Sequence, residues 1–407
     1  MIWFIAWRNI WRNRTRSLII MAAIVIGIFA GTFASAVMRG MMEQRVQNVI
    51  NTELSHIQLH HPEFMKLKES EKFMKGIDQK VQIIDTASGV AAHSERIKIN
   101  SMVSSAETGS GVQLTGINPE KEKQVTNLHE QIIAGDYFED GKHKRIVIGK
   151  KLAEKLKVKV KSKVVLTFQA LDDTLVYEGF KVAGIFETVN STYDETHAFV
   201  RYDDLSKALE MSENTCHEIA ILLDKNEYTD SVQSALQRAF PGVSVQSWTD
   251  LSPEMQVLTK SMELMTYILI FIILLALLFS IINTMLMVVL ERTKEIGMLM
   301  SVGMSRLRVF TMILLESVYL SGFAGIIGIG IGYGIAKMAS VTGIDLTGLY
   351  GEGLKSYGYD PVMFPDIDFP MVINITLMVL MTGVIASLIP ARRALKLNPA
   401  EAVRTDM

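Results

Sequence analysis

Few residues in this sequence have the types and spacing that catalysis or metal binding requires. His60 and His61 form an isolated pair on a predicted strand, and such a pair is more often solvated than bound to a metal. Cys216, the only cysteine in the sequence, adjoins His217, but neighbouring residues on a strand point to opposite faces, so we expect an inert thiol. The motifs H-E-x-x-H, G-x-S-x-G and G-x-x-x-x-G-K-[ST] do not occur. We therefore predict no catalytic residue, no metal site and no nucleotide site on this chain, which argues against an enzyme.

Paired charges in a strongly patterned segment occur at residues 291–308, which follow a long apolar stretch. There, Ile296, Met298, Leu299 and Val302 are interleaved with charged residues and glycines. The pattern suits a short helix that lies across a membrane surface and docks into a groove on another protein, although a solvated loop fits the composition equally well. The positions that we expect to contact the partner are Glu291, Arg292, Lys294, Glu295, Ile296, Gly297, Gly303 and Arg306.

Four apolar stretches must position this segment. Residues 17–38, 264–290 and 369–391 contain no charged residue, and 309–336 contain only Glu316. A helix needs about 20 apolar residues to cross a bilayer, because lipid offers no partner to backbone polar groups, so each stretch is long enough. The predicted fold class is an integral membrane protein with four transmembrane helices and a large α/β extracytoplasmic domain between the first and second helices.

The first apolar stretch also fits the general pattern of a cleavable signal peptide, because arginines precede it and Ala34-Ser35-Ala36 lies near its end. We favour an uncleaved anchor, because the stretch is longer than a signal core and an apolar helical stripe continues to Ile50. The first span is therefore expected to continue into a stalk.

The distribution of lysine and arginine predicts the orientation. Basic residues precede the first span, fill the link after the second and follow the fourth, whereas the loop between the third and fourth spans carries mainly carboxylates. Because basic residues mark the cytoplasmic side, both termini are predicted to be cytoplasmic. The expected segments are a cytoplasmic amphipathic helix at 1–16, the first span and stalk at 17–51, the outer domain at 52–250, a stalk and the second span at 251–290, the charged segment at 291–308, the third span at 309–337, an outer loop at 338–368, the fourth span at 369–391 and a cytoplasmic tail at 392–407.

The outer domain combines strand and helix patterns. Apolar and polar residues alternate at 112–115, and residues 164–168 also have the composition of a strand. Residues 150–156 and 228–240 instead have helical periodicity. We expect a compact α/β body that can divide into two lobes.

A second stalk is predicted at the end of this domain. Ser252 and Pro253 fit the N-cap and first turn of a helix, so the second span begins above the membrane.

Methionines gather at the outer ends of the first two spans, where flexible thioethers would adapt to an apolar substrate such as a lipid anchor, although ordinary helix packing explains them equally well. The candidates for substrate contact are Met38, Met41, Met42, Met262 and Met265.

Glu316 is the single charged residue among residues 309–336 of the third span, where a carboxylate is costly unless it is paired or hydrated. It lies about two helical turns from Arg308, near the predicted cytoplasmic interface. We expect Glu316 to form a structural ion pair with Arg392 or Arg393, which would lock the third span to the tail.

Three segments resemble the MacB and FtsX-like family of ABC transporter permeases. The charged segment, beginning Glu291-Arg292-Thr293-Lys294-Glu295-Ile296-Gly297, is similar to that family's E-R-x-x-E-I-G-x-x-x-[AS]-x-G motif. Residues 388–404 are similar to its closing P-A-x-x-A-x-x-x-x-P-x-x-A-L-R pattern, and residues 6–13 to its amphipathic N-terminal helix. The outer domain resembles most that of the lipoprotein-releasing permeases of the LolC and LolE type, at residues 55–59, 147–153 and 182–186.

The resemblance implies the permease half of a transporter that works by mechanotransmission. A partner ATPase, present in two copies, would bind ATP and Mg, push on the charged segment and thereby move the stalks. The other implied partners are a second permease copy or a sister permease, a lipoprotein or amphiphilic substrate of the inner membrane, and a periplasmic carrier. The hairpin at 170–174 is shorter than the hook of the Lol permease that recruits the carrier, so carrier recruitment stays open. The net charge of −2 gives no reason to expect nucleic acid as a partner.

Two other functions share these membrane motifs. A MacB-like permease would export an antibiotic, a peptide or a toxin, and an FtsX-like regulator would switch periplasmic hydrolases without transport. The outer domain discriminates against the regulator, because it is larger than the domain which that branch carries. Export remains the nearest alternative to lipoprotein release.

Overall fold

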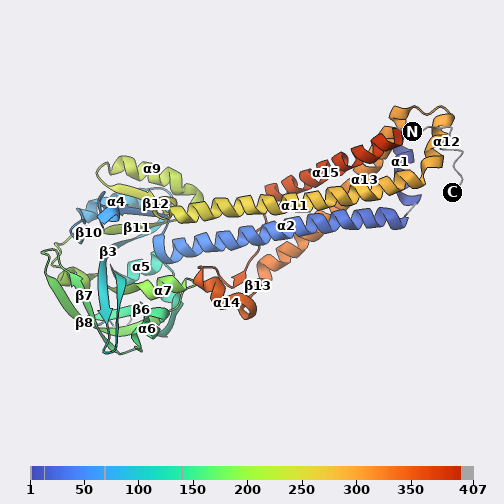
Figure 1. The fold of residues 1–407 in the computed structure, drawn as a ribbon. Helices are drawn as coiled ribbons and strands as arrows, with labels where there is room; N and C mark the ends of the chain where they lie inside the picture. The colour runs from blue at the N-terminus through green and yellow to red at the C-terminus, as the bar shows by residue number, and fades with distance from the viewer. Residues whose placement is uncertain (1, 13, 68–69, 139–140, 396–407) are drawn as a thin grey trace. The chain divides into compact units, whose positions relative to one another are not determined.

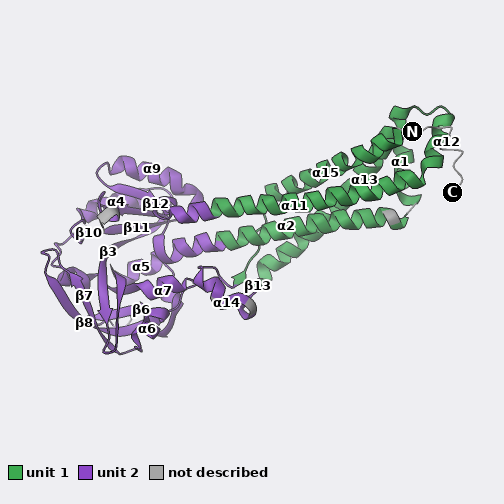
Figure 2. Ribbon diagram, viewed as in Figure 1, with its two compact units in different colours: residues 1–43, 259–345, 362–407 green, residues 44–258, 346–361 purple. Residues whose placement is uncertain are grey.

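The computed structural model of the chain describes residues 2–12, 14–67, 70–138 and 141–395. The chain divides into two compact units (Figure 2). Unit 1 comprises Met1–Glu43, Thr259–Asp345 and Val362–Met407, and unit 2 comprises Gln44–Leu258 and Leu346–Pro361. The predicted tail residues from Lys396 to Arg404 lie outside the described residues.

Among the described residues, four helices are long and apolar enough to cross a membrane, as the sequence predicts. They are α2 (Arg14–Val49), α11 (Pro253–Glu291), α13 (Arg306–Thr342) and α15 (Phe369–Leu395). They lie in unit 1, and α2 and α11 extend from it into unit 2. At a rise of 1.5 Å per residue, the 36 residues of α2 and the 39 residues of α11 measure about 54 and 59 Å, whereas the hydrocarbon core is about 30 Å thick. Both helices are therefore long enough to cross a bilayer and continue beyond it as stalks.

Two short helices, α1 (Ile2–Arg12) and α12 (Thr293–Ser301), lie at one end of the spanning helices (Figure 1). Trp7 of α1 packs against α13, with ring centroids 5.7 Å from Tyr319 and 5.0 Å from Phe323. One apolar core joins both short helices to the spans, because it contains Ile10 of α1 and Ile296 of α12 together with residues of α13 and α15.

A glycine row on α13 allows it to approach α2 closely. A Cβ atom built on Gly328 would lie 2.9 Å from the Cβ of Ile28, and one built on Gly332 would lie 2.4 Å from the hydroxyl of Thr32. The offset glycines Gly330 and Gly334 face open space, with no neighbouring atom within 4 Å. The two rows have the same spacing in the sequence, but only the first makes a helix contact.

We therefore expect Gly332→Leu to destabilise unit 1 and Gly334→Leu to leave it almost unchanged. Overpacking at a tight contact costs about 1–3 kcal/mol. Both substitutions gain the same helix propensity, so the difference between them isolates the contact between α2 and α13. Thermal unfolding in detergent measures this difference. Equal melting temperatures for the two variants would show that the α2–α13 approach is not close.

The outer ends of the spanning helices are joined by ion pairs within unit 1. The Arg39 guanidinium of α2 lies 2.7 Å from a carboxylate oxygen of Asp366 and 3.0 Å from one of Asp368, just before α15. Strands β13 (Ile344–Asp345) and β14 (Val362–Met363) pair antiparallel between α13 and α15. These contacts fix the ends of α2, α13 and α15 against one another.

The first lobe of unit 2 is a four-stranded antiparallel sheet with two helices. Its chain order is strand–helix–strand–strand–helix–strand, and its strands lie in the order β12-β1-β11-β3, which is that of a split βαβ sheet. A separate core of apolar side chains, including Ile57, Ile84 and Leu236, fills this lobe. The elements are β1 (Ile57–His60), α4 (Ile77–Thr86), β3 (Val90–Ser104), β11 (Glu218–Leu223), α9 (Thr229–Ala239) and β12 (Ser244–Ser247).

The second lobe is a closed barrel of six strands inserted between β3 and β11. Strand β3 is 15 residues long and belongs to both lobes, because its first part pairs with β11 and its second part with β4 and β7. Pairing then runs from β4 through β9, β6, β8 and β7 back to β3, so this ring of strands has no free edge. The barrel strands are β4 (Gly109–Ile117), β6 (Arg145–Gly149), β7 (Lys163–Gln169), β8 (Leu175–Phe186) and β9 (His197–Arg201). These two lobes are the mixed α/β architecture that the sequence predicts.

Short elements complete unit 2. Helix α14 (Thr347–Ser356) comes from the predicted loop at 338–368 but packs on the outer domain, where the Lys355 ammonium lies 3.2 Å from the Glu187 carboxylate. The remaining elements are η1 (Ile50–Leu54), α3 (Phe64–Leu67), β2 (Met74–Lys75), α5 (Pro119–Val125), η2 (Leu128–Gln131), β5 (Ile132–Gly135), α6 (Lys150–Leu156), α7 (Ser191–Thr196), α8 (Tyr202–Ala208), β10 (Thr215–Cys216), η3 (Asn226–Tyr228) and α10 (Trp248–Leu251).

Candidate functional site

Helix α12 presents two different faces. Ile296 is buried in the core of unit 1, and Gly297 is buried beside it. In contrast, Met298 is 60 % exposed, and Val302, which follows the end of the helix, is 85 % exposed. The buried face holds α12 on the spans, while the exposed apolar side chains are available to a partner.

A network of ion pairs and hydrogen bonds ties α12 to α1 and α13. Glu295 of α12 forms an ion pair with Arg12 of α1, and its Oε2 lies 3.1 Å from the Nε of Arg292. Arg292 in turn places its Nη1 3.1 Å from Oε1 of Glu316 on α13. Asn9 of α1 donates a hydrogen bond of 2.6 Å to the same Glu316 oxygen. Burial would raise the pKa of Glu295, but hydrogen bonds and charge from Arg12 and Arg292 outweigh it and lower that pKa, so Glu295 is held ionised.

The partners of Glu316 differ from those that the sequence led us to expect. Its carboxylate is buried and bound by Arg292 and Asn9, whereas the predicted partners Arg392 and Arg393 are both exposed. The ion pair therefore links the third span to the segment after the second span, and not to Arg392 or Arg393. Asn9 gave no signal in the sequence, because its contact depends on how α1 packs against α13.

The other predicted contact positions lie around the ends of α12. Glu291, Lys294 and Arg306 are exposed, and Gly303 has a φ of +103°, a conformation that residues with a Cβ rarely adopt. Gly303 therefore permits the tight turn from α12 into α13. The structure thus gathers Arg292 and Glu295 in the network and leaves the remaining charged positions at the surface.

The predicted methionine candidates lie on α2 and α11 of unit 1. The Thr266 hydroxyl of α11 lies 3.6 Å from the sulfur of Met38 on α2, so the two helices are in contact at this level. Met42 is buried and Met265 is 58 % exposed, while Met41 and Met262 are half-buried. Their role in substrate contact stays a prediction.

The outer domain contains a buried ion network that sequence reasoning missed. Arg96 of β3 lies between two carboxylates, with its Nη2 2.6 Å from Glu122 of α5 and its Nη1 2.8 Å from Glu218 of β11. Lys98 and His60 also contact Glu218, at 2.7 and 3.1 Å. Burial would lower the pKa of Arg96, but the two carboxylates outweigh it and raise that pKa. The alternation of Arg96 and Lys98 along β3 was the available signal.

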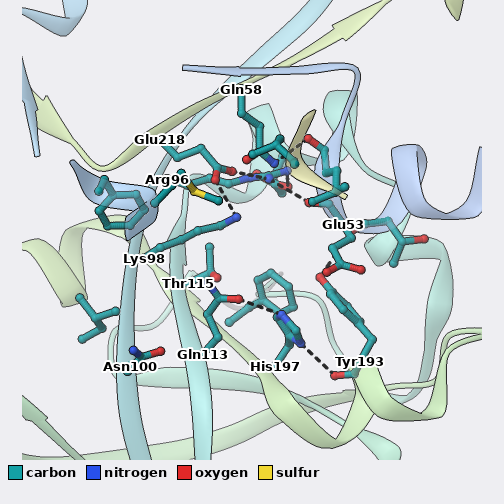
Figure 3. Close-up of a pocket in the computed structure, with 18 residues that line it drawn as sticks. Glu53, Gln58, Arg96, Lys98, Asn100, Gln113, Thr115, Tyr193, His197 and Glu218 are labelled. Atoms are coloured by element: carbon teal, nitrogen blue, oxygen red, sulfur yellow. Dashed lines mark hydrogen bonds and ion pairs between the residues drawn. The ribbon is translucent and has the colours of Figure 1, made fainter. Parts of the chain in front are cut away.

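This network borders a pocket within unit 2 (Figure 3). The pocket has a volume of about 170 Å³ and is lined by polar residues of β3 and β4, by the residues that join α2 to the domain, and by apolar residues that include Phe64, Met65 and Phe199. Glu53, Lys98, Gln113 and His197 surround the space in the close-up.

Comparisons with known proteins agree with this architecture. The family model of the FtsX-like permease C-terminal region matches residues 267–399, and the model of the MacB-like periplasmic core domain matches residues 17–239.

Individual relatives cover different shares of the chain. A lipoprotein-releasing system transmembrane protein, LolC of Xylella fastidiosa, is 26 % identical over 313 residues, which cover 72 % of this chain and 73 % of that protein. The macrolide export ATP-binding/permease protein MacB of Campylobacter fetus is 33 % identical over 122 residues, which cover 30 % of this chain and 16 % of that protein. The crystal structure of the periplasmic region of MacB from Actinobacillus actinomycetemcomitans superposes with a TM-score of 0.35 at 8 % identity and covers 54 % of this chain and 98 % of that one.

The two family models follow one another along the chain and account for both units. The match to the periplasmic core includes the first span, and the match to the FtsX-like region contains α12, α13 and α15. Because the periplasmic core model alone covers more than half of the residues, the chain belongs to the family of ABC transporter permeases that combine a MacB-like periplasmic core domain with an FtsX-like C-terminal region.

Proposed function

We propose that this permease uses ATP hydrolysis by a separate ABC ATPase to release lipoproteins from the inner membrane. The observation that carries the proposal is helix α12, which is held on unit 1 by Ile296 and Gly297 while Met298 and Val302 stay exposed. Apolar side chains that are exposed beside charged ones are the composition of a protein docking surface. We infer that the ATPase binds there.

Members of this family work with an ATPase subunit, and the four apolar helices make this chain a multi-pass inner-membrane protein. In our proposal the ATPase is present in two copies and binds ATP and Mg, since the permease sequence has no phosphate-binding loop. The two termini and α12 then lie on the cytoplasmic side, and a second permease copy or a sister permease completes the complex.

The proposed path of force runs along the two stalk helices. Closure of the ATPase displaces α12 and, through the contacts of Glu295 and Glu316, the helices packed against it. Helices α2 and α11 are each longer than the bilayer is thick, so movement of their cytoplasmic halves reaches the residues that lead into unit 2. Such movement would expel a substrate held at the outer ends of the spans, near Met38 and Met262.

The relationship to LolC supports lipoproteins as the cargo, because it extends over most of the chain. The match to the macrolide exporter extends over less than a third of it. Export of an antibiotic, a peptide or a toxin is therefore the second candidate function.

Purification of the complex from native membranes with its ligands retained, followed by mass spectrometry, tests the cargo. We expect diacyl- or triacyl-modified proteins in the sample, together with an ABC ATPase. Peptides or small amphiphiles without acylated proteins would overturn lipoprotein release in favour of export. A periplasmic hydrolase in the sample without cargo would instead indicate a regulator.

A further inference from the structure

The pocket in the outer domain has a wall that belongs to the first stalk. Thr52, Glu53 and Leu54, which form the last turn after α2, line one side of it, and Leu251, just before α11, lines another. Three side chains of the domain hold this turn by its backbone carbonyls. Arg96 donates to Glu53 at 3.3 Å, Gln58 to Leu54 at 2.7 Å and Tyr193 to Thr52 at 3.4 Å. A ligand in the pocket would therefore touch the turn through which α2 enters the domain.

The floor of the pocket is a polar face of three neighbouring strands. The strand register places Lys98 opposite Thr115, Asn100 opposite Gln113, and Gln113 opposite His197. Side chains alternate along a strand, so Ile97, Ile99 and Leu114 point into the apolar barrel core while these polar residues point away from it. The floor thus offers an ammonium group, a hydroxyl group and two side-chain amides side by side (Figure 3).

The charges of the pocket wall disfavour an anionic ligand. The two positive charges of Arg96 and Lys98 already face the carboxylates of Glu122 and Glu218. Glu53 adds a further carboxylate to the lining. A ligand that is uncharged but rich in hydrogen-bond donors and acceptors fits this wall best, because it satisfies the amides without adding negative charge.

Two observations favour a peptide over a sugar. First, Tyr193 and His197 stack on each other with ring centroids 4.0 Å apart, so one face of each ring is already covered and cannot stack on a sugar. Second, a further shallow hollow shares Asn100 and Gln113 with the pocket and extends the lined surface to Ser101 and Gly111, which suits a linear ligand. The side-chain amide of Asn100 can donate to a peptide carbonyl and accept from a peptide N–H. The Oε1 atom of Gln113 lies 2.9 Å from Nε2 of His197, so the amide nitrogen of Gln113 is the group that can donate to a peptide carbonyl.

We propose that this pocket and hollow bind an extended, uncharged segment of polypeptide, and that the bound segment contacts the last turn of the first stalk. The inference deepens the proposed function and rests on it, because the segment would belong to the protein being released. Movement of α2 would then change the pocket that holds the cargo, and an occupied pocket would resist that movement.

The test uses the full chain in detergent and a fluorescein-labelled, non-acylated peptide of about eight Ser, Asn and Gly residues, long enough for an extended strand to span the hollow. Anisotropy measures binding. We expect saturable binding that Gly111→Trp weakens about tenfold, which corresponds to about 1.4 kcal/mol. Gly179→Trp is the matched control, because both glycines lie on barrel strands and have no neighbouring atom within 4 Å of an added Cβ.

A second variant, Gln113→Leu, keeps the volume but removes the amide and is expected to weaken binding to a similar degree. The proposal is overturned if the unmodified chain does not bind the peptide, if Gly179→Trp weakens binding as much as Gly111→Trp, or if a neutral oligosaccharide binds in place of the peptide. The assay contains neither an acyl chain nor an ATPase. If the chain binds the peptide in this assay but the complex purified from native membranes carries no acylated protein, the peptide-binding pocket is supported and only lipoproteins as the cargo are rejected.

Discussion

Replacing both Met298 and Val302 with Asp is expected to weaken binding of the ATPase by at least about 100-fold. Each exposed apolar side chain that a partner buries contributes about 1.5–3 kcal/mol, so the loss of two exceeds the 2.7 kcal/mol that this factor requires. The substitutions also place carboxylates in the contact, which adds a cost of desolvation. Since both side chains are exposed in the chain itself, the fold of unit 1 should be preserved.

Copurification of the ATPase with the permease, and the ATPase rate of the complex, measure this effect. The control is Ile83→Asp, which introduces the same charge at an exposed apolar position on α4 of the outer domain. We expect the control to retain the ATPase. If the double variant retains it as well, the exposed apolar residues of α12 do not form the docking surface.

The second large effect is expected at the buried ion pair of Arg292 and Glu316. Replacing Glu316 with Leu removes the buried carboxylate from the Arg292 guanidinium, which is only 16 % exposed, and leaves it the contact with Glu295 at 3.1 Å. Removal of one partner from an isolated buried pair costs about 3–5 kcal/mol. The remaining contact with Glu295, which is 44 % exposed, offsets part of this cost for Arg292. We therefore expect a marked fall in the thermal stability of the permease in detergent, together with loss of the coupling between ATP hydrolysis and substrate release.

A double variant separates stability from coupling. Arg292→Met combined with Glu316→Leu replaces the pair by apolar side chains of similar volume, and such replacements are often neutral for stability. We expect the double variant to recover the melting temperature but not coupled release, because the link between α12 and α13 is then no longer ionic. Full coupling in the double variant, or in Glu316→Gln, would show that the pair serves stability alone.

The membrane half of the fold could be predicted because its signals are local. Hydropathy and the positions of arginines and lysines are properties of short stretches, so the four spans and the segment at 291–308 follow from them directly. The same holds for one helix of the outer domain. The helix predicted at 150–156 coincides with α6, because its periodicity is complete within seven residues. The spacing of Gly328 and Gly332 equals that of Gly330 and Gly334, so only the packing on α2 distinguishes the rows.

Features that depend on pairing distant segments could not be predicted. The Asn9 contact with Glu316 joins residues 307 positions apart and exists because Trp7 packs against the aromatic residues of α13. The barrel closes because β3 pairs with β7. The sequence pattern of each strand does not specify which residues of the two strands lie opposite each other. For the same reason, the sequence alone does not distinguish Lys98, Asn100 and Gln113 from ordinary surface residues, although the register of β3 and β4 places them on one face of the sheet.

In the proposed mechanism, α12 receives force from an ATP-hydrolysing subunit. A photo-crosslinking amino acid at position 302, where Val302 is 85 % exposed, tests it in intact cells when the adducts are identified by mass spectrometry. We predict a covalent adduct with an ABC ATPase that is lost when the same amino acid is placed at Ile83. Adducts with periplasmic proteins only, or with lipid only, would show that α12 does not contact an ABC ATPase and would contradict the proposed mechanism.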